Sequence, residues 1–102
     1  MSTKVALITG AGSGIGRASA LDMAEKGAAV MCADINSQAA EGTVGLIQEA
    51  GGRADAYAFD VSKGSEVQQA IDTTASRMGG LDIIFNNAGV GGGYGWNDTI
   101  AI

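Results

Sequence analysis

The stretch Thr9–Gly16 reads Thr-Gly-Ala-Gly-Ser-Gly-Ile-Gly and lies between an apolar run and a helical pattern. The run before it, Val5–Ile8, is aliphatic throughout and predicts a short buried strand. After it, Ala20, Met23 and Ala24 recur at helical spacing. Glycines let a backbone turn tightly and approach a ligand, and the start of a helix offers N–H groups to an anion. The sequence therefore predicts a strand, a phosphate-binding turn and a helix in that order.

The spacing of the glycines separates two kinds of nucleotide-binding turn. The common dinucleotide fingerprint needs glycine at its first, third and sixth positions. Counted from Gly10 or Gly12, the sixth residue is Ile15 or Arg17, so the fingerprint is not met. The pattern that fits is Thr-Gly-x-x-x-Gly-x-Gly, formed by Thr9, Gly10, Gly14 and Gly16. It resembles the first strand–helix turn of the short-chain dehydrogenase/reductase family, although a connecting loop could also be rich in glycine.

A second apolar run, Ala29–Ala33, ends on Asp34. An acidic residue about 20 residues beyond the glycines is where a ribose hydroxyl pair is held in dinucleotide-binding folds. The alternative is a turn residue or a helix cap, because Asn36 and Ser37 beside it also favour turns. In the ribose role the carboxylate would repel the 2′-phosphate of NADP, and Arg17 is the nearest arginine that could compensate. The sequence predicts NAD as the preferred cofactor.

Two asparagines follow a fourth apolar run. Leu81–Phe85 predicts a buried strand, and Asn86-Asn87-Ala88-Gly89 comes directly after it. Buried asparagines need hydrogen-bond partners and are depleted in strands, so a plain core is a poor explanation for them. The same signature after the fourth strand is typical of short-chain dehydrogenases, where it steadies the sheet and borders the cofactor.

The resemblance also implies a role for Asp60 and Val61, which follow the predicted strand Ala56–Phe59. In the family, such a pair lies along the adenine ring; taken alone, Asp60 could equally cap a helix. The cofactor-binding residues that the resemblance implies are Gly10, Ser13, Gly14, Ile15, Gly16, Asp34, Ile35, Asp60, Val61, Asn87, Ala88 and Gly89.

Strands and helices alternate along the chain. One predicted helix carries Ala40, Val44 and Ile47 on its inner face and ends at Gly51-Gly52. The next has an apolar stripe from Val67 to Met78, with Ser62 as its expected cap and Gly79-Gly80 as its stop, and neither helix stripe needs more than a core role. This order predicts an α/β fold of the Rossmann type, a doubly wound parallel sheet with strand order 3-2-1-4. Residues 1–102 are then the N-terminal part of a single NAD(P)-binding domain.

The C-terminal residues set the limits of the functional prediction. Trp96–Ile102 is expected to begin another helix, and its Trp-Asn-Asp run is similar to that of 3-oxoacyl-acyl-carrier-protein reductases. The family's catalytic Asn, Ser, Tyr and Lys would follow Ile102, so no catalytic residue is expected within the chain. Neither Tyr57 nor Tyr94 has a lysine four residues later. If the chain stops at Ile102, the strand at 81–85 is expected to be an open edge that favours self-association.

Composition excludes several classes of protein. With 46% hydrophobic and 17% charged residues the chain is globular rather than disordered, and its net charge of −5 argues against nucleic-acid binding. It has no histidine and no metal-ligand cluster is expected. Cys32 is the only cysteine and is predicted to be a core residue, which fits a reducing cytoplasm. Only a short apolar run follows the N-terminus, so neither a signal segment nor a membrane span is expected.

Two functions from different classes remain. The first is the NAD(P)-binding part of a short-chain oxidoreductase that transfers hydride between the cofactor and an alcohol or ketone, a homo-oligomer when full length. The second is a non-catalytic nucleotide-binding module, or a half-domain that needs a partner. A Ser and a Tyr-x-x-x-Lys downstream of Ile102 would favour the first.

Overall fold

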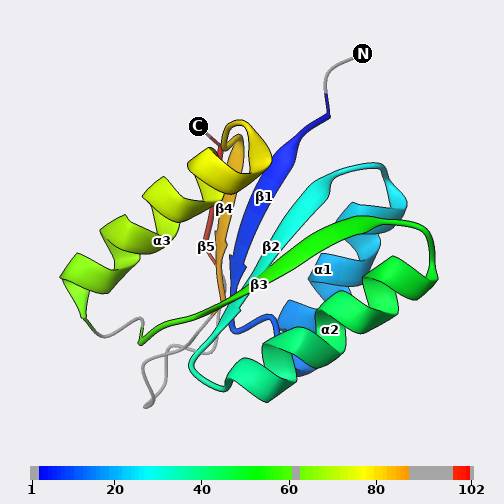
Figure 1. Ribbon diagram of the computed structural model, residues 1–102, viewed down its shortest axis with the longest axis horizontal. Coiled ribbons are helices and arrows are strands. Elements are labelled where there is room, and N and C mark those ends of the chain that lie inside the picture. The colour runs from blue at the N-terminus through cyan, green and yellow to red at the C-terminus, as the bar shows by residue number, and fades with distance from the viewer. Residues whose placement is uncertain (1–2, 61–62, 88–97, 102) are drawn as a thin grey trace.

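The computed structural model of the protein describes residues 3–60, 63–87 and 98–101. They form one sheet with helices on both faces (Figure 1). The strands are β1 (Val5–Thr9), β2 (Ala29–Asp34), β3 (Arg53–Ala58), β4 (Ile83–Asn86) and β5 (Asp98–Ala101). The helices are α1 (Gly14–Glu25), α2 (Ser37–Glu49) and α3 (Gly64–Met78).

The sheet has the order β3-β2-β1-β4-β5. Its first four strands are mutually parallel, with β1 between β2 and β4. This confirms the predicted α/β class and the order 3-2-1-4. Because the carboxyl ends of parallel strands share one edge of a sheet, Thr9, Asp34 and Asn86 come together at that edge.

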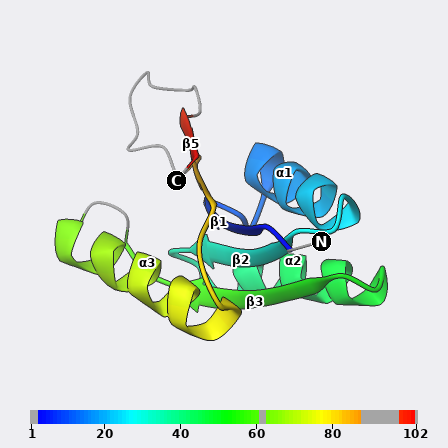
Figure 2. The same ribbon diagram turned by 90° about the horizontal axis from the view of Figure 1, so that it is seen from above.

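Side chains of the central strands alternate between two cores, as successive residues of a strand must. Leu7 of β1 lies in a core with Met78 of α3. Its neighbour Ile8 lies in the other core, with Ala20 of α1 and Ile47 of α2. Figures 1 and 2 show the same division, with α1 and α2 on one face of the sheet and α3 on the other. Both faces of β1 are therefore covered, and all five of its residues are buried.

The expectation for the C-terminal residues was wrong in two respects. Residues 98–101 form a strand rather than a helix, and β5 pairs antiparallel with β4. The segment Thr99-Ile100-Ala101 carries two β-branched residues, which favour extended backbone. β4 offers an edge of unpaired N–H and C=O groups, and this segment occupies it. β4 is therefore an interior strand, and β3 and β5 are the edges of the described sheet.

The start of α3 also differs from the expectation. The N-cap of α3 is Lys63, not Ser62, and Lys63 makes no side-chain cap bond. Glu66 in the first turn reaches back instead, and its Oε1 accepts a hydrogen bond of 3.1 Å from the backbone N–H of Asp60. The negative charge of Glu66 in the first turn also interacts favourably with the positive end of the helix dipole.

The predicted glycine stops are found at two helix ends. Gly79 ends α3 in the left-handed conformation, with φ +83°. Gly51 follows α2 with φ +87°, where a side chain would be strained. Its neighbour Gly52 allows close packing instead: a Cβ there would lie 2.7 Å from Cγ2 of Ile47.

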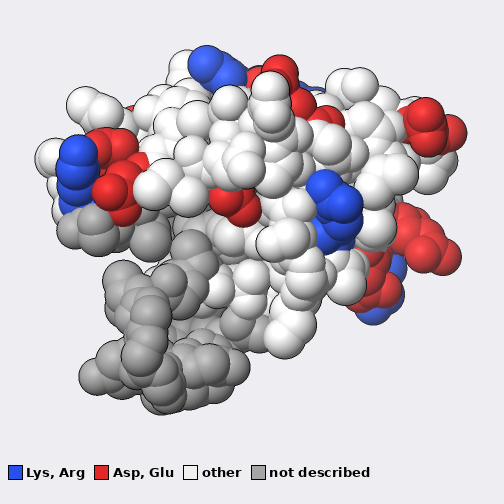
Figure 3. All heavy atoms as spheres, turned by 90° about the horizontal axis from the view of Figure 1, so that it is seen from below, with Lys and Arg blue, Asp and Glu red and all other residues white. Residues whose placement is uncertain are grey.

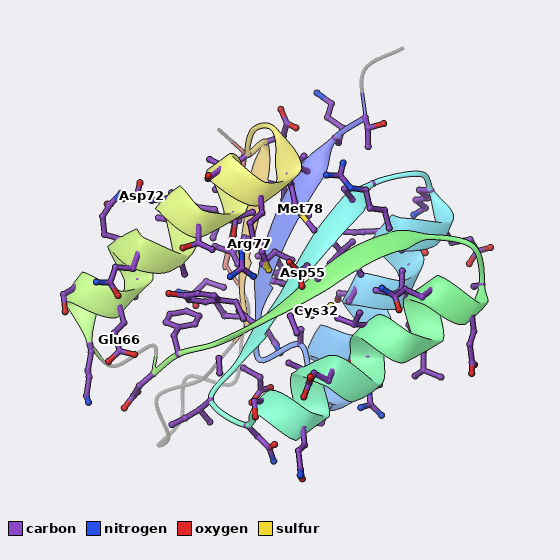
Figure 4. All side chains as sticks on the ribbon, viewed as in Figure 1. Cys32, Asp55, Glu66, Asp72, Arg77 and Met78 are labelled. Atoms are coloured by element: carbon purple, nitrogen blue, oxygen red, sulfur yellow. The ribbon has the colours of Figure 1, made fainter. Side chains whose placement is uncertain are left out.

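β3 is held to α3 by an ion pair. Arg77 of α3 and Asp55 of β3 point toward one another, with 3.2 Å between Nη1 and Oδ2 (Figure 4). Both side chains are about half exposed, so the pair adds little stability, on the order of 0–1 kcal/mol. A charged residue on an edge strand also disfavours pairing with another chain. Within the described ranges, each helix is too short or too polar to cross a bilayer.

Candidate functional site

The glycine loop, residues 10–13, connects β1 to α1 at the carboxyl edge of the sheet. Gly10 and Gly14 adopt φ of +65° and +56°, which residues with a Cβ rarely do. Among the described residues, no atom lies within 4 Å of a Cβ placed at Gly14, so this part of the structure leaves open space there. A Cβ at Gly16 would instead run into the carbonyl group of Gly10 and lie 2.7 Å from Nδ2 of Asn87. Gly16 therefore allows the helix to pack against the loop, whereas Gly14 leaves space above it.

The end of β2 holds the loop in place. The backbone N–H of Ala11 donates to the carbonyl of Ala33 at 3.0 Å, and the N–H of Gly12 donates to Oδ2 of Asp34 at 2.9 Å. A Cβ at Gly12 would lie 2.8 Å from the same Oδ2 and 2.5 Å from Cβ of Ala39. The loop thus passes so close to β2 and α2 that only glycine fits at position 12.

The N-terminus of α1 is open. Its N-cap, Ser13, has extended backbone but makes no side-chain cap bond, and no acidic residue lies in the first turn. The first N–H groups of a helix have no partner within the helix and carry the positive end of its dipole. Ile15 beside them is 59% exposed although it is apolar. A diphosphate fits this place, because it would satisfy the N–H groups in the open space at Gly14.

The two asparagines join β4 to β1. Oδ1 of Asn86 accepts from Oγ1 of Thr9 at 2.9 Å, and the N–H of Asn87 donates to the same Oγ1 at 2.9 Å. Nδ2 of Asn87 lies 3.4 Å from the carbonyl oxygen of Gly10, where it donates a long hydrogen bond. The asparagine pair therefore steadies the junction of the central strands, and Asn87 also contacts the glycine loop.

Asp34 uses both carboxylate oxygens at the end of β2. Oδ2 accepts from Gly12, and Oδ1 accepts from the N–H of Asn36 at 3.0 Å. A carboxylate has about four acceptor positions, so capacity remains for the hydroxyls of a ribose. Ile35, next along the chain, is 72% exposed at the same corner. An exposed isoleucine of this kind suits the flat face of an adenine ring.

The turn after β3 lies against the same corner. The N–H of Phe59 donates to the backbone carbonyl of Asp34 at 3.2 Å, which brings Asp60 to the region of Asp34. Val61, Ala88 and Gly89, predicted as site residues, lie outside the described residues. Of the predicted site residues, those that the structure describes all lie at the carboxyl edge of the sheet.

Two residues that contact the loop were not predicted as site residues. Thr43 of α2 is fully buried, and its hydroxyl lies 2.6 Å from the carbonyl oxygen of Ala11. Nε of Arg17 donates to the same hydroxyl at 2.9 Å. The sequence did carry a signal for Thr43. It is a polar residue at helical spacing from Ala40 and Ile47, so it lies on the buried face of α2 with them.

Cys32 is a core residue, as predicted, and lies on the face of β2 toward α2 (Figure 4). Burial raises the pKa of its thiol from 9.0 to about 12, against the opposing effect of the positive charge of Arg17. The thiol therefore stays neutral at pH 7 and is a poor nucleophile.

Figure 3 looks onto the carboxyl edge of the sheet. On the described part of this face, acidic and basic side chains are scattered among a majority of uncharged ones. The anion-binding capacity argued above therefore comes from backbone N–H groups at α1 rather than from a cluster of basic side chains.

Comparison with known proteins agrees with this geometry. Residues 4–100 match the family model of the short chain dehydrogenases. The short-chain dehydrogenase/reductase homolog YusS of Bacillus subtilis (strain 168) is 47% identical over 88 residues, which cover 85% of this chain and 81% of that protein. The 7alpha-hydroxysteroid dehydrogenase of Escherichia coli (strain K12) is 45% identical over 89 residues, which cover 87% of this chain and 35% of the enzyme. Cyclohexanol dehydrogenase of Acinetobacter sp. (strain SE19) is 40% identical over 97% of this chain and 39% of the enzyme.

A solved structure supports the same assignment. The crystal structure of a hydroxysteroid dehydrogenase from Escherichia coli superposes with a TM-score of 0.83 at 45% identity, covering 87% of this chain and 38% of the enzyme. The chain spans somewhat more than a third of the length of cyclohexanol dehydrogenase and of 7alpha-hydroxysteroid dehydrogenase. Binding of a nicotinamide cofactor is the common property that the family implies. By the family match, the strand order and the glycine loop, the chain belongs to the short-chain dehydrogenase/reductase family.

Proposed function

We propose that the protein binds NAD at the carboxyl edge of the sheet and transfers hydride between NAD and a small alcohol or ketone. The observation that carries this proposal is the uncapped N-terminus of α1, which lies beside the carboxylate of Asp34. The cofactor supplies the hydride chemistry when bound. The residues of this chain bind and orient it.

Each part of the dinucleotide has a partner at this edge. The pyrophosphate meets the N–H groups at the start of α1, with Ser13, Gly14 and Ile15 around it. The adenosine ribose donates its hydroxyls to Asp34. The adenine would lie against the exposed side chain of Ile35, near the turn at Asp60, and the resemblance to the family adds Val61 to this part of the site. Asn87, Ala88 and Gly89 would border the cofactor, as the resemblance to the family implies.

The preference for NAD over NADP rests on charge. The 2′-phosphate of NADP would lie close to the negative carboxylate of Asp34 and be repelled by it. Arg17, the nearest candidate to neutralise that phosphate, donates instead to Thr43 and, at 3.4 Å, to the carbonyl oxygen of Ala39. With Arg17 turned toward α2, NAD is the cofactor that this corner favours.

Hydride transfer needs groups that hold a proton at the substrate oxygen. Tyr57 packs against Phe59, with ring centroids 5.9 Å apart, and belongs to the core beneath α3. We propose that the catalytic Ser, Tyr and Lys that the family implies supply these groups in the whole protein. We further propose a cytoplasmic homo-oligomer; the free, buried thiol of Cys32 is compatible with a reducing compartment.

Replacing Asp34 tests the cofactor assignment. We expect Asp34→Ala to weaken NAD binding by about tenfold or more and to narrow the NAD/NADP preference, because ribose acceptors and a negative charge are lost together. NADP affinity should not rise to that of wild-type NAD, since Gly12 and Asn36 also lose their acceptor. The measurement is the dissociation constant of each cofactor by calorimetry.

Asp72→Ala is the matched control, because it removes the same charge from the exposed surface of α3. Equal affinity of the wild type for NAD and NADP would contradict the assignment. NAD binding without turnover over a panel of alcohols would favour a non-catalytic nucleotide-binding module instead.

A further inference from the structure

The buried hydroxyl of Thr43 acts on the glycine loop rather than on its own helix. Its Oγ1 lies 2.6 Å from the carbonyl oxygen of Ala11 and 3.4 Å from that of Ala39, one turn earlier in α2. A hydroxyl has a single proton to donate, and the shorter contact is the hydrogen bond. α2 thus reaches across to the loop through one side chain.

Arg17 strengthens this bond from the other side. Its Nε donates to Oγ1 of Thr43 at 2.9 Å, so the hydroxyl accepts from a cation while it donates to Ala11. A hydroxyl polarised in this way is a better donor, because hydrogen bonds in a chain reinforce one another. A glycine at position 42 leaves room for the guanidinium, since a Cβ there would lie 3.1 Å from Nη2.

The carbonyl and the N–H groups of the Ala11–Gly12 segment are therefore held by different elements. The carbonyl of Ala11 is held from α2 by Thr43, and the N–H groups of Ala11 and Gly12 are held from β2 by Ala33 and Asp34. This segment leads directly to the open start of α1. A change in its orientation would move Ser13 and the N–H groups that follow it.

We propose that Thr43 and Arg17 are positioning residues that fix the glycine loop in the conformation that receives the cofactor's diphosphate. The inference rests on the proposed function, in which the start of α1 binds that group. Neither side chain needs to touch the cofactor. Both act by holding the Ala11 carbonyl.

The chain provides a matched control at Thr74 of α3. Thr74 is as buried as Thr43, and its hydroxyl also makes a short bond, 2.7 Å to the carbonyl oxygen of Ala70. That carbonyl belongs to the same helix and not to the loop. Thr74→Val therefore removes a buried helical hydroxyl without releasing the loop.

The first test is the binding of ADP-ribose, which carries the diphosphate but performs no redox chemistry. We expect Thr43→Val to raise its dissociation constant about tenfold, the effect of one lost hydrogen bond to an organised loop. Thr43→Ser keeps the hydroxyl and should stay within about twofold of wild type, as should Thr74→Val. Adenosine, which lacks the diphosphate, should bind all variants alike.

The second test needs no cofactor. Amide hydrogen exchange of Gly12 in the ligand-free protein should be faster in Thr43→Val than in wild type and unchanged in Thr74→Val. Arg17→Met should change both readouts in the same direction as Thr43→Val but by less, because the hydroxyl of Thr43 still donates to Ala11. The double variant should be no worse than Thr43→Val, because Arg17 acts through Thr43.

The outcomes separate the two proposals. If wild type binds ADP-ribose and Thr43→Val binds it equally well, the positioning role is wrong while the cofactor site stands. If wild type fails to bind ADP-ribose and NAD, the proposed function is wrong. Unchanged exchange at Gly12 in Thr43→Val contradicts the positioning role in either case.

Discussion

The helices α1 and α2 begin at the same edge of the sheet, yet their first turns are built differently. At α2 the side chain of Asn36 accepts a hydrogen bond of 3.1 Å from the N–H of Ala39, so the helix caps itself. At α1 the N-cap Ser13 makes no such bond. One of the first N–H groups of α2 is thus bonded to the helix's own cap, whereas Ser13 provides no such bond at the start of α1.

The open end is nevertheless the better supported one. The loop before α1 is held by β2, β4 and α2, through Asp34, Asn87 and Thr43. A ligand site of this kind needs N–H groups that are fixed in place but not already bonded. In this chain, the helix start that lacks a cap bond of its own is the one whose preceding loop is fixed by residues from other elements, as the proposed cofactor site requires.

The largest expected effect on ligand affinity comes from filling the space at the start of α1. Gly14→Val should lower ADP-ribose affinity by about 100-fold or more, because the side chain would fill the space at the start of α1 and remove several charge-assisted hydrogen bonds. The free energy of unfolding should fall by only about 1–2 kcal/mol, the strain of a side chain at φ +56°. Calorimetry and urea unfolding measure the two effects.

Gly27→Val is the control for that strain. Gly27 follows α1 at the opposite edge with φ +96°, and a Cβ there meets nothing within 4 Å. It should lose similar stability and keep its affinity for ADP-ribose. If both variants bind equally well, the glycine loop is a simple connector.

Smaller effects on stability, unequal at the two sites, should distinguish the two helix caps. Asn36→Ala should lower the free energy of unfolding by about 1 kcal/mol, the usual effect of losing a cap. Ser13→Ala should leave stability within about 0.3 kcal/mol of wild type, because no cap bond is lost. Thermal unfolding of the two variants side by side gives the comparison, and a larger loss in Ser13→Ala would show that α1 is capped after all.

The parallel sheet and the edge that carries the site could be predicted from the sequence. The apolar runs that end on Thr9, Asp34 and Asn86 fix both strand identity and edge, because a parallel sheet brings such ends together. The glycine spacing identified the turn. Local sequence patterns were sufficient to predict these features, because each depends on residues of a single strand or loop.

Other features depend on contacts that no local pattern records. Thr43 and Arg17 are 26 residues apart, and their bond exists only because α1 and α2 pack side by side. The start of α3 was misassigned because the helix begins one residue later than the Ser62 cap implied, with Lys63 as N-cap, and Glu66 of its first turn bonds back to the N–H of Asp60. Residues 98–101 form a strand because β4 has an edge to pair with, which outweighs the helical expectation.

Amide chemical shifts would show whether the start of α1 receives the cofactor's diphosphate. The protein would be titrated with ADP-ribose and, separately, with adenosine. We expect the difference between the two titrations to be concentrated at the amides of Gly14, Ile15 and Gly16, with little change at Ser37 and Gln38 at the start of α2. Equal shifts with both ligands at residues 14–16, or a larger difference at the start of α2, would contradict it.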